Sequence, residues 1–316
     1  MSPSAGIGHD TAAFTTPFSN LDEYLALPRM SGLVLSPDGS RLVTQVSTLN
    51  HDGTKAHTAL WEVFPTRARP ARRLTRSAQG ESGAAFTPDG DLLFTSSRPD
   101  AESKDAEKPA EAPALWVLPA GGGEARVVAV HPGGVSGVKT ARSSAAVVFA
   151  SDVLPSATDA AEDERLRAVR KDSKVSAILH EGHPVRYWDH DLGPAAPHLL
   201  GWHFSAGDDV ARRIEAAQIG SEHLAVVDLA PKPGGALREA SYDLSPDGTF
   251  VVTTWNLTEA RGGLRSILVR LDLDTQRRTV LVDDPDADLS HPVVSPDGRA
   301  VVFLRETLAT PDSAPT

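Results

Sequence analysis

A repeated four-residue motif constrains the fold of this chain more than any other feature of its sequence. Each copy reads Ser/Thr-Pro-Asp-Gly, and the copies occupy residues 36–39, 87–90, 245–248 and 295–298. Pro presets φ at the second position, Asp tolerates the third, and Gly accepts a left-handed conformation at the fourth. Each copy therefore predicts a β-turn, and four copies in one setting indicate a repeated structural unit.

The setting of each motif is strand, turn, strand. Short runs rich in Val, Leu, Phe and Thr flank the turns, as at residues 33–35 and 42–46 around the first copy. Such runs, bounded by turn residues, are typical of β-strands. A second pair of runs follows, for example at 114–118 and 125–128. The sequence therefore predicts four strands per unit, joined by hairpins.

The spacing of the motifs distinguishes between all-β architectures. From residue 36 to 87, 87 to 245 and 245 to 295, the intervals are 51, 158 and 50 residues. Four antiparallel strands in a unit of roughly 40–50 residues are the signature of a β-propeller blade, whereas a β-sandwich predicts no fixed period. The long interval is close to three units, and residues 145–151 resemble the strand after a turn, which indicates a degenerate unit there. The predicted fold class is an all-β propeller of four-stranded antiparallel blades.

The propeller blades are expected to span most of the chain. The expected organisation is a flexible tail at 1–20, a short helix at 21–30 with Asn20 as N-cap, blades at 31–305 with charged insertions at 97–113 and 159–174, and a disordered tail at 306–316. In the second insertion Asp163 and Arg167 have helical i,i+4 spacing, which favours an exposed helix with a solvated face. The last motif is followed by one strand only, so we expect an incomplete ring.

Charge and composition exclude several kinds of partner. The net charge of −11 disfavours nucleic acid. We expect no membrane partner, because no apolar run is long enough to span a bilayer and the start has no secretory signal pattern. The chain has no cysteine, which excludes disulfides and thiolate metal sites and fits a cytoplasmic location.

The chain offers no convincing nucleophile. A serine hydrolase of the α/β type needs Gly-x-Ser-x-Gly on a strand-to-helix turn. Residues 80–84 and 134–138 come near this pattern but lack the final Gly and precede strands of the repeat. The four motif aspartates, Asp38, Asp89, Asp247 and Asp297, are expected to be structural because they lie in turns. No catalytic residue and no cofactor is predicted.

One polar segment stands apart from the repeat. Residues 180–191 gather three histidines and several carboxylates, which could be metal ligands, but no His-Glu-x-x-His motif is present. Satisfied loop histidines are the favoured interpretation, and a metalloenzyme is a minor alternative. The candidates for a substrate channel are Arg186, Tyr187, Trp188, Asp189 and His190. These side chains could bind a ligand at one end of the central channel. The favoured interpretation is that the Tyr and Trp pack at a strand edge on a neighbouring blade.

The ordered motifs resemble a known family. The Ser-Pro-Asp-Gly units, the Leu-Trp strands at 60–61 and 115–116, and the segment 186–194 are similar to the propeller of prolyl-oligopeptidase-family serine peptidases. The acylaminoacyl-peptidase and dipeptidyl-peptidase-like bacterial branch is the nearest match, over residues 21–305. The turn motif alone is shared with other propellers, including periplasmic translocation proteins.

The resemblance implies a function for the propeller. In that family a seven-bladed propeller caps an α/β-hydrolase domain bearing Ser, Asp and His, and admits only short or unfolded peptides. This sequence lacks the hydrolase domain, so no family catalytic residue has a position here. The resemblance therefore implies a non-catalytic propeller that selects short or acyl-peptide-like substrates for an α/β-hydrolase domain or chain. The alternative is a stand-alone propeller that binds a protein or peptide.

Overall fold

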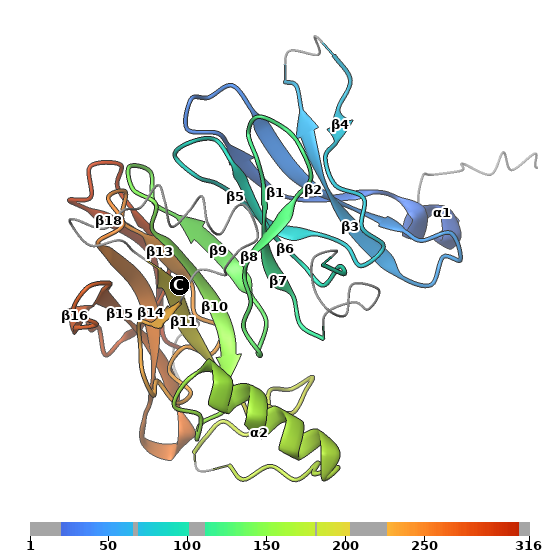
Figure 1. Ribbon diagram of the computed structural model, residues 1–316. Coiled ribbons are helices and arrows are strands. Elements are labelled where there is room, and N and C mark those ends of the chain that lie inside the picture. The colour runs from blue at the N-terminus through green and yellow to red at the C-terminus, as the bar shows by residue number, and fades with distance from the viewer. Residues whose placement is uncertain (1–19, 66–68, 101–110, 181, 203–225, 310–316) are drawn as a thin grey trace, which may run out of the picture.

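The computed structural model describes residues 20–65, 69–100, 111–180, 182–202 and 226–309. The expected tails at 1–20 and 306–316 lie largely outside the described residues, as does much of the insertion at 97–113. The described part contains four four-stranded antiparallel sheets and one two-stranded sheet (Figure 1). The first strands of successive sheets contact one another, so the sheets follow each other as the blades of a β-propeller.

Every sheet has its strands in sequence order. Blade 1 comprises β1 (Arg29–Leu35), β2 (Leu42–Leu49), β3 (Ala56–Val63) and β4 (Arg72–Arg73). Blade 2 comprises β5 (Ser82–Phe86), β6 (Leu92–Ser96), β7 (Ala114–Leu118) and β8 (Arg126–Ala129). Blade 3 comprises β9 (Ser136–Thr140), β10 (Val147–Val153), β11 (Ala196–Trp202) and β12 (Val227–Asp228). Blade 4 comprises β13 (Tyr242–Leu244), β14 (Phe250–Thr258), β15 (Leu264–Asp272) and β16 (Arg278–Val282), and blade 5 comprises β17 (Ala287–Val294) and β18 (Val301–Thr307).

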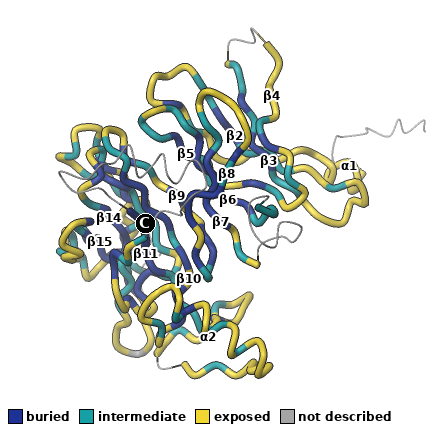
Figure 2. The backbone as a smooth tube through the Cα atoms, viewed as in Figure 1, coloured by how far each residue is buried: buried dark blue, intermediate teal, exposed yellow. Residues whose placement is uncertain are grey.

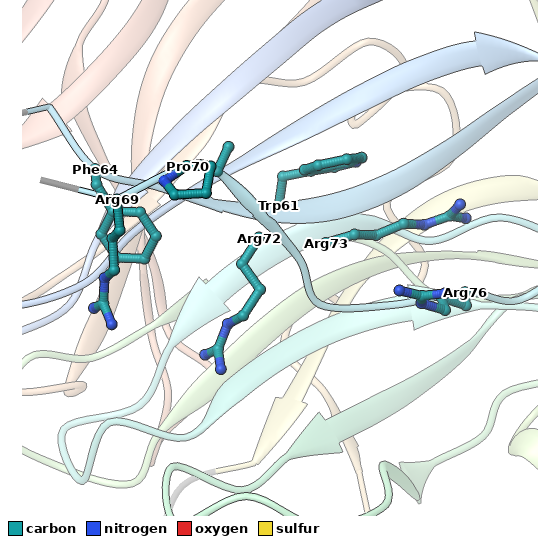
Figure 3. Close-up of a pocket in the computed structure, with 8 residues that line it drawn as sticks. Trp61, Phe64, Arg69, Pro70, Arg72, Arg73 and Arg76 are labelled. Carbon is teal, nitrogen blue, oxygen red and sulfur yellow. The ribbon is translucent and has the colours of Figure 1, made fainter. Parts of the chain in front are cut away.

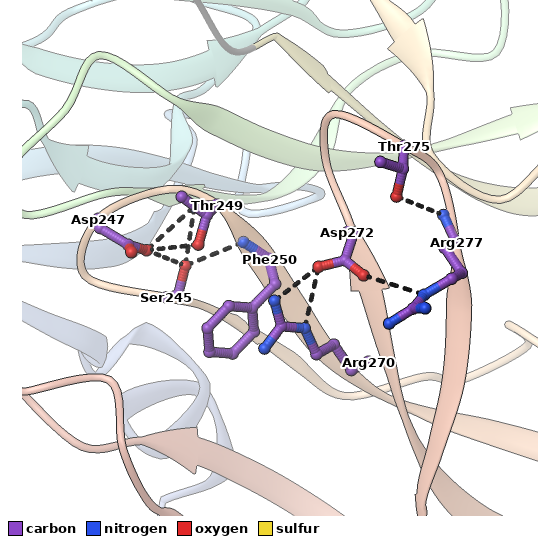
Figure 4. A network of polar contacts seen from close by, with 8 residues as sticks. All are labelled: Ser245, Asp247, Thr249, Phe250, Arg270, Asp272, Thr275 and Arg277. Atoms are coloured by element: carbon purple, nitrogen blue, oxygen red, sulfur yellow. Dashed lines mark hydrogen bonds and ion pairs between the residues drawn. The ribbon is translucent and has the colours of Figure 1, made fainter. Parts of the chain in front are cut away.

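The Ser-Pro-Asp-Gly motifs form the turns between first and second strands. In blade 4 the Ser245 hydroxyl donates to the Asp247 carboxylate at 2.7 Å, and the amide of Phe250 donates to the Ser245 hydroxyl oxygen at 3.0 Å (Figure 4). Gly248 has φ +75°, the left-handed conformation that the turn requires. The same Ser-to-Asp bond recurs at Asp38 (2.6 Å) and Asp297 (2.5 Å), which confirms a structural role for these aspartates.

The turn bonds also set the charge state of the aspartates. The Ser36 hydroxyl and then the groups of Ser40 donate to the Asp38 carboxylate and lower its pKa to about 2. The turn of blade 2 has Thr87 in place of Ser, and its hydroxyl oxygen accepts the amide of Asp91 at 3.1 Å. These closures are local, because each involves groups at most five residues apart along the chain.

Each blade packs on the next through alternate residues of its strands. Val43 of blade 1 shares a core cluster with Phe86, Leu92 and Phe94 of blade 2. Val148 of blade 3 shares a cluster with Leu244 and Val251 of blade 4. We call the side of a blade that meets the following blade its forward face, and the opposite side its backward face. The inner and middle strands carry most of the buried residues (Figure 2).

The long interval between the second and third motifs contains one four-stranded blade in the described residues. The run at 145–151 enters β10, as its resemblance to a post-turn strand predicts. An insertion lies between β10 and β11 and includes α2 (Ala160–Asp172). Residues 203–225, between β11 and β12, lie outside the described part. Insertion, and not only degenerate repeats, therefore accounts for the length.

Two features differ from the expected ranges. Helix α1 (Leu21–Ala26) is capped by Asn20, whose side chain accepts the amide of Asp22 at 3.0 Å. It is shorter than the range 21–30, because β1 begins at Arg29. Strand β18 runs to Thr307, beyond the expected end of the blades. No helix within the described ranges is long and apolar enough to cross a membrane.

Candidate functional site

The candidate residues 186–190 form a tight hairpin turn between α2 and β11. Arg186 and Asp191 form an isolated antiparallel bridge, and their side chains form an ion pair at 3.5 Å. The Tyr187 amide donates to the His190 carbonyl at 2.9 Å. In the next residue pair of the hairpin, the Leu192 amide donates to the carbonyl of Val185 at 3.1 Å. The structure thus brings all five candidates together in one turn with a defined backbone.

Trp188 is at the tip of this hairpin and is 93% exposed. The favoured interpretation, that it packs on a neighbouring blade, is therefore wrong for Trp188. The rings of Tyr187 and His190 meet edge to face, with centroids 5.5 Å apart, and the His190 Nδ1 lies 2.7 Å from the Asp189 carboxylate. The neighbours of Trp188 contact one another and stabilise the turn. The indole of Trp188 is therefore free to contact a ligand.

The hairpin lies at the end of the propeller opposite the Ser-Pro-Asp-Gly turns. The strands run in the same order in every blade, so all connections between second and third strands lie at one end. The hairpin belongs to this connection in blade 3. The segment that leads into the hairpin touches the same connection in blade 4, where the Thr258 hydroxyl donates to the His183 carbonyl at 3.4 Å. Tyr187 is half-buried, and burial, followed by the charge of Glu239, raises its pKa.

Helix α2 anchors the insertion that carries the hairpin. Its residue Asp163 is fully buried, accepts the amide of Leu154 at 2.8 Å and pairs with Arg167 at 2.7 Å. Arg167 also donates to the Asp152 carbonyl at 2.7 Å. The i,i+4 pair expected from the sequence is present, but the expectation of a wholly solvated face is wrong at Asp163. That buried carboxylate fixes the helix to the end of β10.

A buried Ser–His pair lies beneath α2 and was not recognised from the sequence. The Ser151 hydroxyl is 2.7 Å from Nδ1 of His131, and both residues are buried. On the neighbouring strand, Nδ1 of His198 is 2.7 Å from the Asp228 carboxylate. Burial, the largest cause, lowers the pKa of His131. Because substrate cannot reach this buried serine, the pair is a structural network and not a catalytic dyad.

The two near-matches to a nucleophile turn are β-bulges of first strands. Gly83 and Gly137 follow Ser82 and Ser136 and have φ +67° and +61°, and the pairing register shifts at both places. A third Ser-Gly pair, ending at Gly32, bulges in the same way in β1. Cross-blade bonds fill the space that these bulges leave; for example, the Tyr242 hydroxyl donates to the Gly137 carbonyl at 2.6 Å. The serines belong to strands and not to a strand-to-helix turn, as the sequence indicated.

A cavity of about 520 Å³ lies beside the β3–β4 hairpin and has a strongly basic lining (Figure 3). The guanidinium of Arg69 lies over the ring of Phe64, 3.8 Å from its centroid. Arg72 pairs with the buried Glu62 at 2.8 Å, and Arg73 donates to the Thr75 carbonyl at 2.7 Å. Groups of the chain itself thus hold three of the arginines, and the arrangement stabilises the hairpin.

The segment 180–191 is not gathered into a metal centre in the described residues. No group of three or more His, Asp or Glu side chains is placed to hold an ion in that part of the chain. Glu181 lies outside the described residues. The geometry that the structure does show at this segment is that of a hydrogen-bonded turn.

Comparisons with known proteins identify the fold. No protein-family model and no curated protein sequence matches the chain. Among solved structures, the acylaminoacyl peptidase of Pyrococcus horikoshii is similar over 90% of this chain and 36% of that chain, with 10% identity and a TM-score of 0.54. The β-propeller domain of the trilobed protease from Pyrococcus furiosus is similar over 90% of this chain and 65% of that domain, with 9% identity and a TM-score of 0.47.

A protein of another kind is also similar. A putative TolB from Agrobacterium tumefaciens matches 88% of this chain and 70% of its own length, with 14% identity and a TM-score of 0.47. The chain spans about a third of the Pyrococcus horikoshii peptidase. At 10% identity the likeness to the Pyrococcus horikoshii peptidase shows the fold alone, and together with the four-stranded antiparallel blades it identifies the chain as a β-propeller module.

Proposed function

We propose that this chain is the non-catalytic propeller of a serine peptidase of the prolyl-oligopeptidase type, acting in the cytoplasm. In this proposal it binds short peptides and selects them for an α/β-hydrolase domain or chain. The observation that carries the proposal is the hairpin that presents Trp188, 93% exposed, at the end of the propeller where the insertions lie. The likeness of the fold to an acylaminoacyl peptidase supports the choice of partner.

The hairpin has the properties of a peptide-binding element. An exposed indole on a rigid turn provides a large contact area without a large loss of conformational freedom on binding. The Arg186–Asp191 and Asp189–His190 pairs give the turn both signs of charge close to Trp188. A short or unfolded peptide exposes side chains and backbone that such a surface can reach, whereas a folded protein presents few of them.

The positions of three serines support this division of labour. Ser82 and Ser136 lie in β-bulges of first strands, and Ser151 is buried against His131. Acyl transfer requires an accessible nucleophile, a base and an oxyanion site in one place. In the proposal the hydrolase partner supplies all three, and this chain supplies binding and exclusion.

Calorimetric titration with short unstructured peptides tests the binding role. Replacing a central aromatic contact weakens binding by about tenfold or more, so Trp188→Ala should lose about that factor. The matched control is Leu179→Ala, because Leu179 is 85% exposed in the same insertion but lies outside the hairpin. Equal affinity of the Trp188 variant and the wild type would contradict the proposed site.

Two further measurements test the assignment of catalysis to a partner. A fluorophosphonate probe should leave this chain unlabelled, and labelling of one serine in the isolated chain would overturn the non-catalytic role. Affinity capture should recover a protein with an α/β-hydrolase domain. Recovery of an unrelated protein only would support the stand-alone binding module instead.

A further inference from the structure

The two terminal blades expose apolar residues at positions that the inner blades bury. On blade 5, Val293, Val302 and Leu304 are 58%, 72% and 60% exposed. On blade 1, Leu33 and Leu35 are 64% and 60% exposed. We call the first set the forward end face and the second set the backward end face. Neither face is covered by the residues that the structure describes.

Strand register shows which residues of the inner blades correspond to the forward end face. In each blade the first paired residue of the second strand lies opposite the last residue before the turn. The residue that follows it along the second strand points to the forward face. The residues at this next position are Val43, Leu93, Val148, Val252 and Val302. The first four are at most 3% exposed, whereas Val302 is 72% exposed.

The backward end face shows the same contrast. Leu35 is the last residue before the turn of blade 1. Its equivalents before the turns of blades 2, 4 and 5 are Phe86, Leu244 and Val294, which are 6%, 5% and 7% exposed. Leu35, at 60%, has no preceding blade to cover it. Each end face is therefore one half of a contact that the chain makes repeatedly.

Inside the chain the two halves pack on each other. Val43 on the forward face of blade 1 shares a core cluster with Phe86 on the backward face of blade 2. Val148 on the forward face of blade 3 shares a cluster with Leu244 of blade 4. Val302 thus occupies the same position in the repeat as Val43. Leu35 occupies the same position as Phe86 and Leu244. The occupant that fits the forward end face is a backward face, and this chain itself carries an exposed one.

We propose that the forward end face of one copy of this chain binds the backward end face of a second copy, head to tail. The contact continues the packing between blades across two molecules and removes both apolar patches from water. It is heterologous, because two different surfaces meet, so each dimer keeps one free face of each type. This proposal does not depend on the peptide-binding role, since the hairpin at 185–192 is part of neither face.

Analytical ultracentrifugation of the full chain tests the proposal. Association follows mass action, so between about 1 µM and about 100 µM the wild type should shift from monomer to larger species. Leu35→Asp destroys the backward end face, and Val302→Asp destroys the forward one. Either change buries a charge in the contact, and each variant alone should associate at least about 30-fold more weakly.

Mixing the two variants gives the decisive result. The Leu35→Asp chain keeps an intact forward end face, and the Val302→Asp chain keeps an intact backward one. An equimolar mixture should therefore form a dimer that cannot grow, with an affinity within about threefold of the wild type, because one intact contact remains. The control Leu179→Asp, at an exposed residue outside both faces, should associate as the wild type does.

Three outcomes would overturn the proposal. The first is a wild type that stays monomeric at the highest concentration, which would leave the faces to a different partner. The second is a Val302→Asp chain that still dimerises alone, because that indicates a symmetric contact. The third is a mixture that stays monomeric. Circular dichroism of every variant shows whether a loss of association reflects a loss of folding.

Discussion

Val252 and Val302 occupy the same position in the repeat, yet one is fully buried and the other is 72% exposed. Both follow a Ser-Pro-Asp-Gly turn, both lie in a second strand, and both point to the forward face of their blade. Val252 has β17 and β18 beyond it, whereas no described residue covers Val302. The local sequence therefore determines that a residue lies in a strand and to which face its side chain points. Whether that side chain is buried depends on the neighbouring blade.

The largest expected difference is in stability after substitution by a charge. Val252→Asp buries an unpaired carboxylate, so it should cost more than about 4 kcal/mol of unfolding free energy or prevent folding. Val302→Asp places the same carboxylate in water and should change the free energy by less than about 0.5 kcal/mol. Urea unfolding of both variants at low micromolar concentration, where the chain is monomeric, measures the two values. Similar losses of unfolding free energy in the two variants would contradict the difference in burial between Val252 and Val302.

The backward face gives a second pair with a smaller effect. Leu244→Ala removes a buried side chain and leaves a cavity between blades 3 and 4, so it should cost about 2–5 kcal/mol. Leu35→Ala, at the equivalent position of blade 1, should cost less than about 0.5 kcal/mol. Thermal and urea unfolding together check the result. A large loss at Leu35 would show that blade 1 is covered in the monomer.

Two glycines sharpen the comparison between crowded and open sites. Gly39 has φ +73° and no atom within 4 Å of an added Cβ, so Gly39→Ala should cost about 1 kcal/mol for the left-handed backbone alone. At Gly137, with φ +61°, an added Cβ would meet the Tyr242 hydroxyl at 2.5 Å. Gly137→Ala should therefore cost about 3 kcal/mol, since it also disturbs the bond of that hydroxyl to the bulge. Equal costs would contradict the packing of β9 on β13.

The smallest expected effect is a dependence of stability on pH. Burial lowers the pKa of His131, so the folded state holds it neutral where the unfolded state, with a value near about 6.5, takes up a proton. The contribution of neutral His131 to the free energy of unfolding is fully present above about pH 6.5. It decreases as the pH falls from there toward the lower pKa of His131 in the folded state. Urea unfolding at a series of pH values should show this decrease in the wild type and a weaker one in His131→Gln. The exposed His51→Gln variant is the control and should keep the wild-type slope.

Sequence reasoning was most effective where the physics is local. The Pro-Asp-Gly turns could be predicted because Ser36, Asp38 and Gly39 close each turn among themselves. Their period then gave the four-stranded blades. The charge of residues 159–174 indicated an insertion there, and α2 lies within it. The long interval still misled the counting of units, because its length is close to three units of the repeat and the described part holds one blade.

The site and the end faces depend on contacts between distant residues. The segment 186–190 could be identified as a polar and aromatic turn, but the exposure of Trp188 depends on where blades 3 and 4 place it. The recurring Ser-Gly pairs were visible in the sequence, and their role as bulges became clear only with partners such as Tyr242, 105 residues away. Val302 has the apolar pattern of a core residue, so its own strand does not indicate that it is exposed.

Thiol reactivity tests the contrast between inner and terminal blades most directly, because the chain has no cysteine of its own. Val252→Cys and Val302→Cys would each introduce one thiol at the same position of the repeat. At low micromolar concentration in native buffer, we predict that the thiol at Val302 reacts with a maleimide at least about 100-fold faster than the thiol at Val252, which reacts only when the core opens. Equal rates at the two positions would contradict the exposure of Val302 on the forward end face.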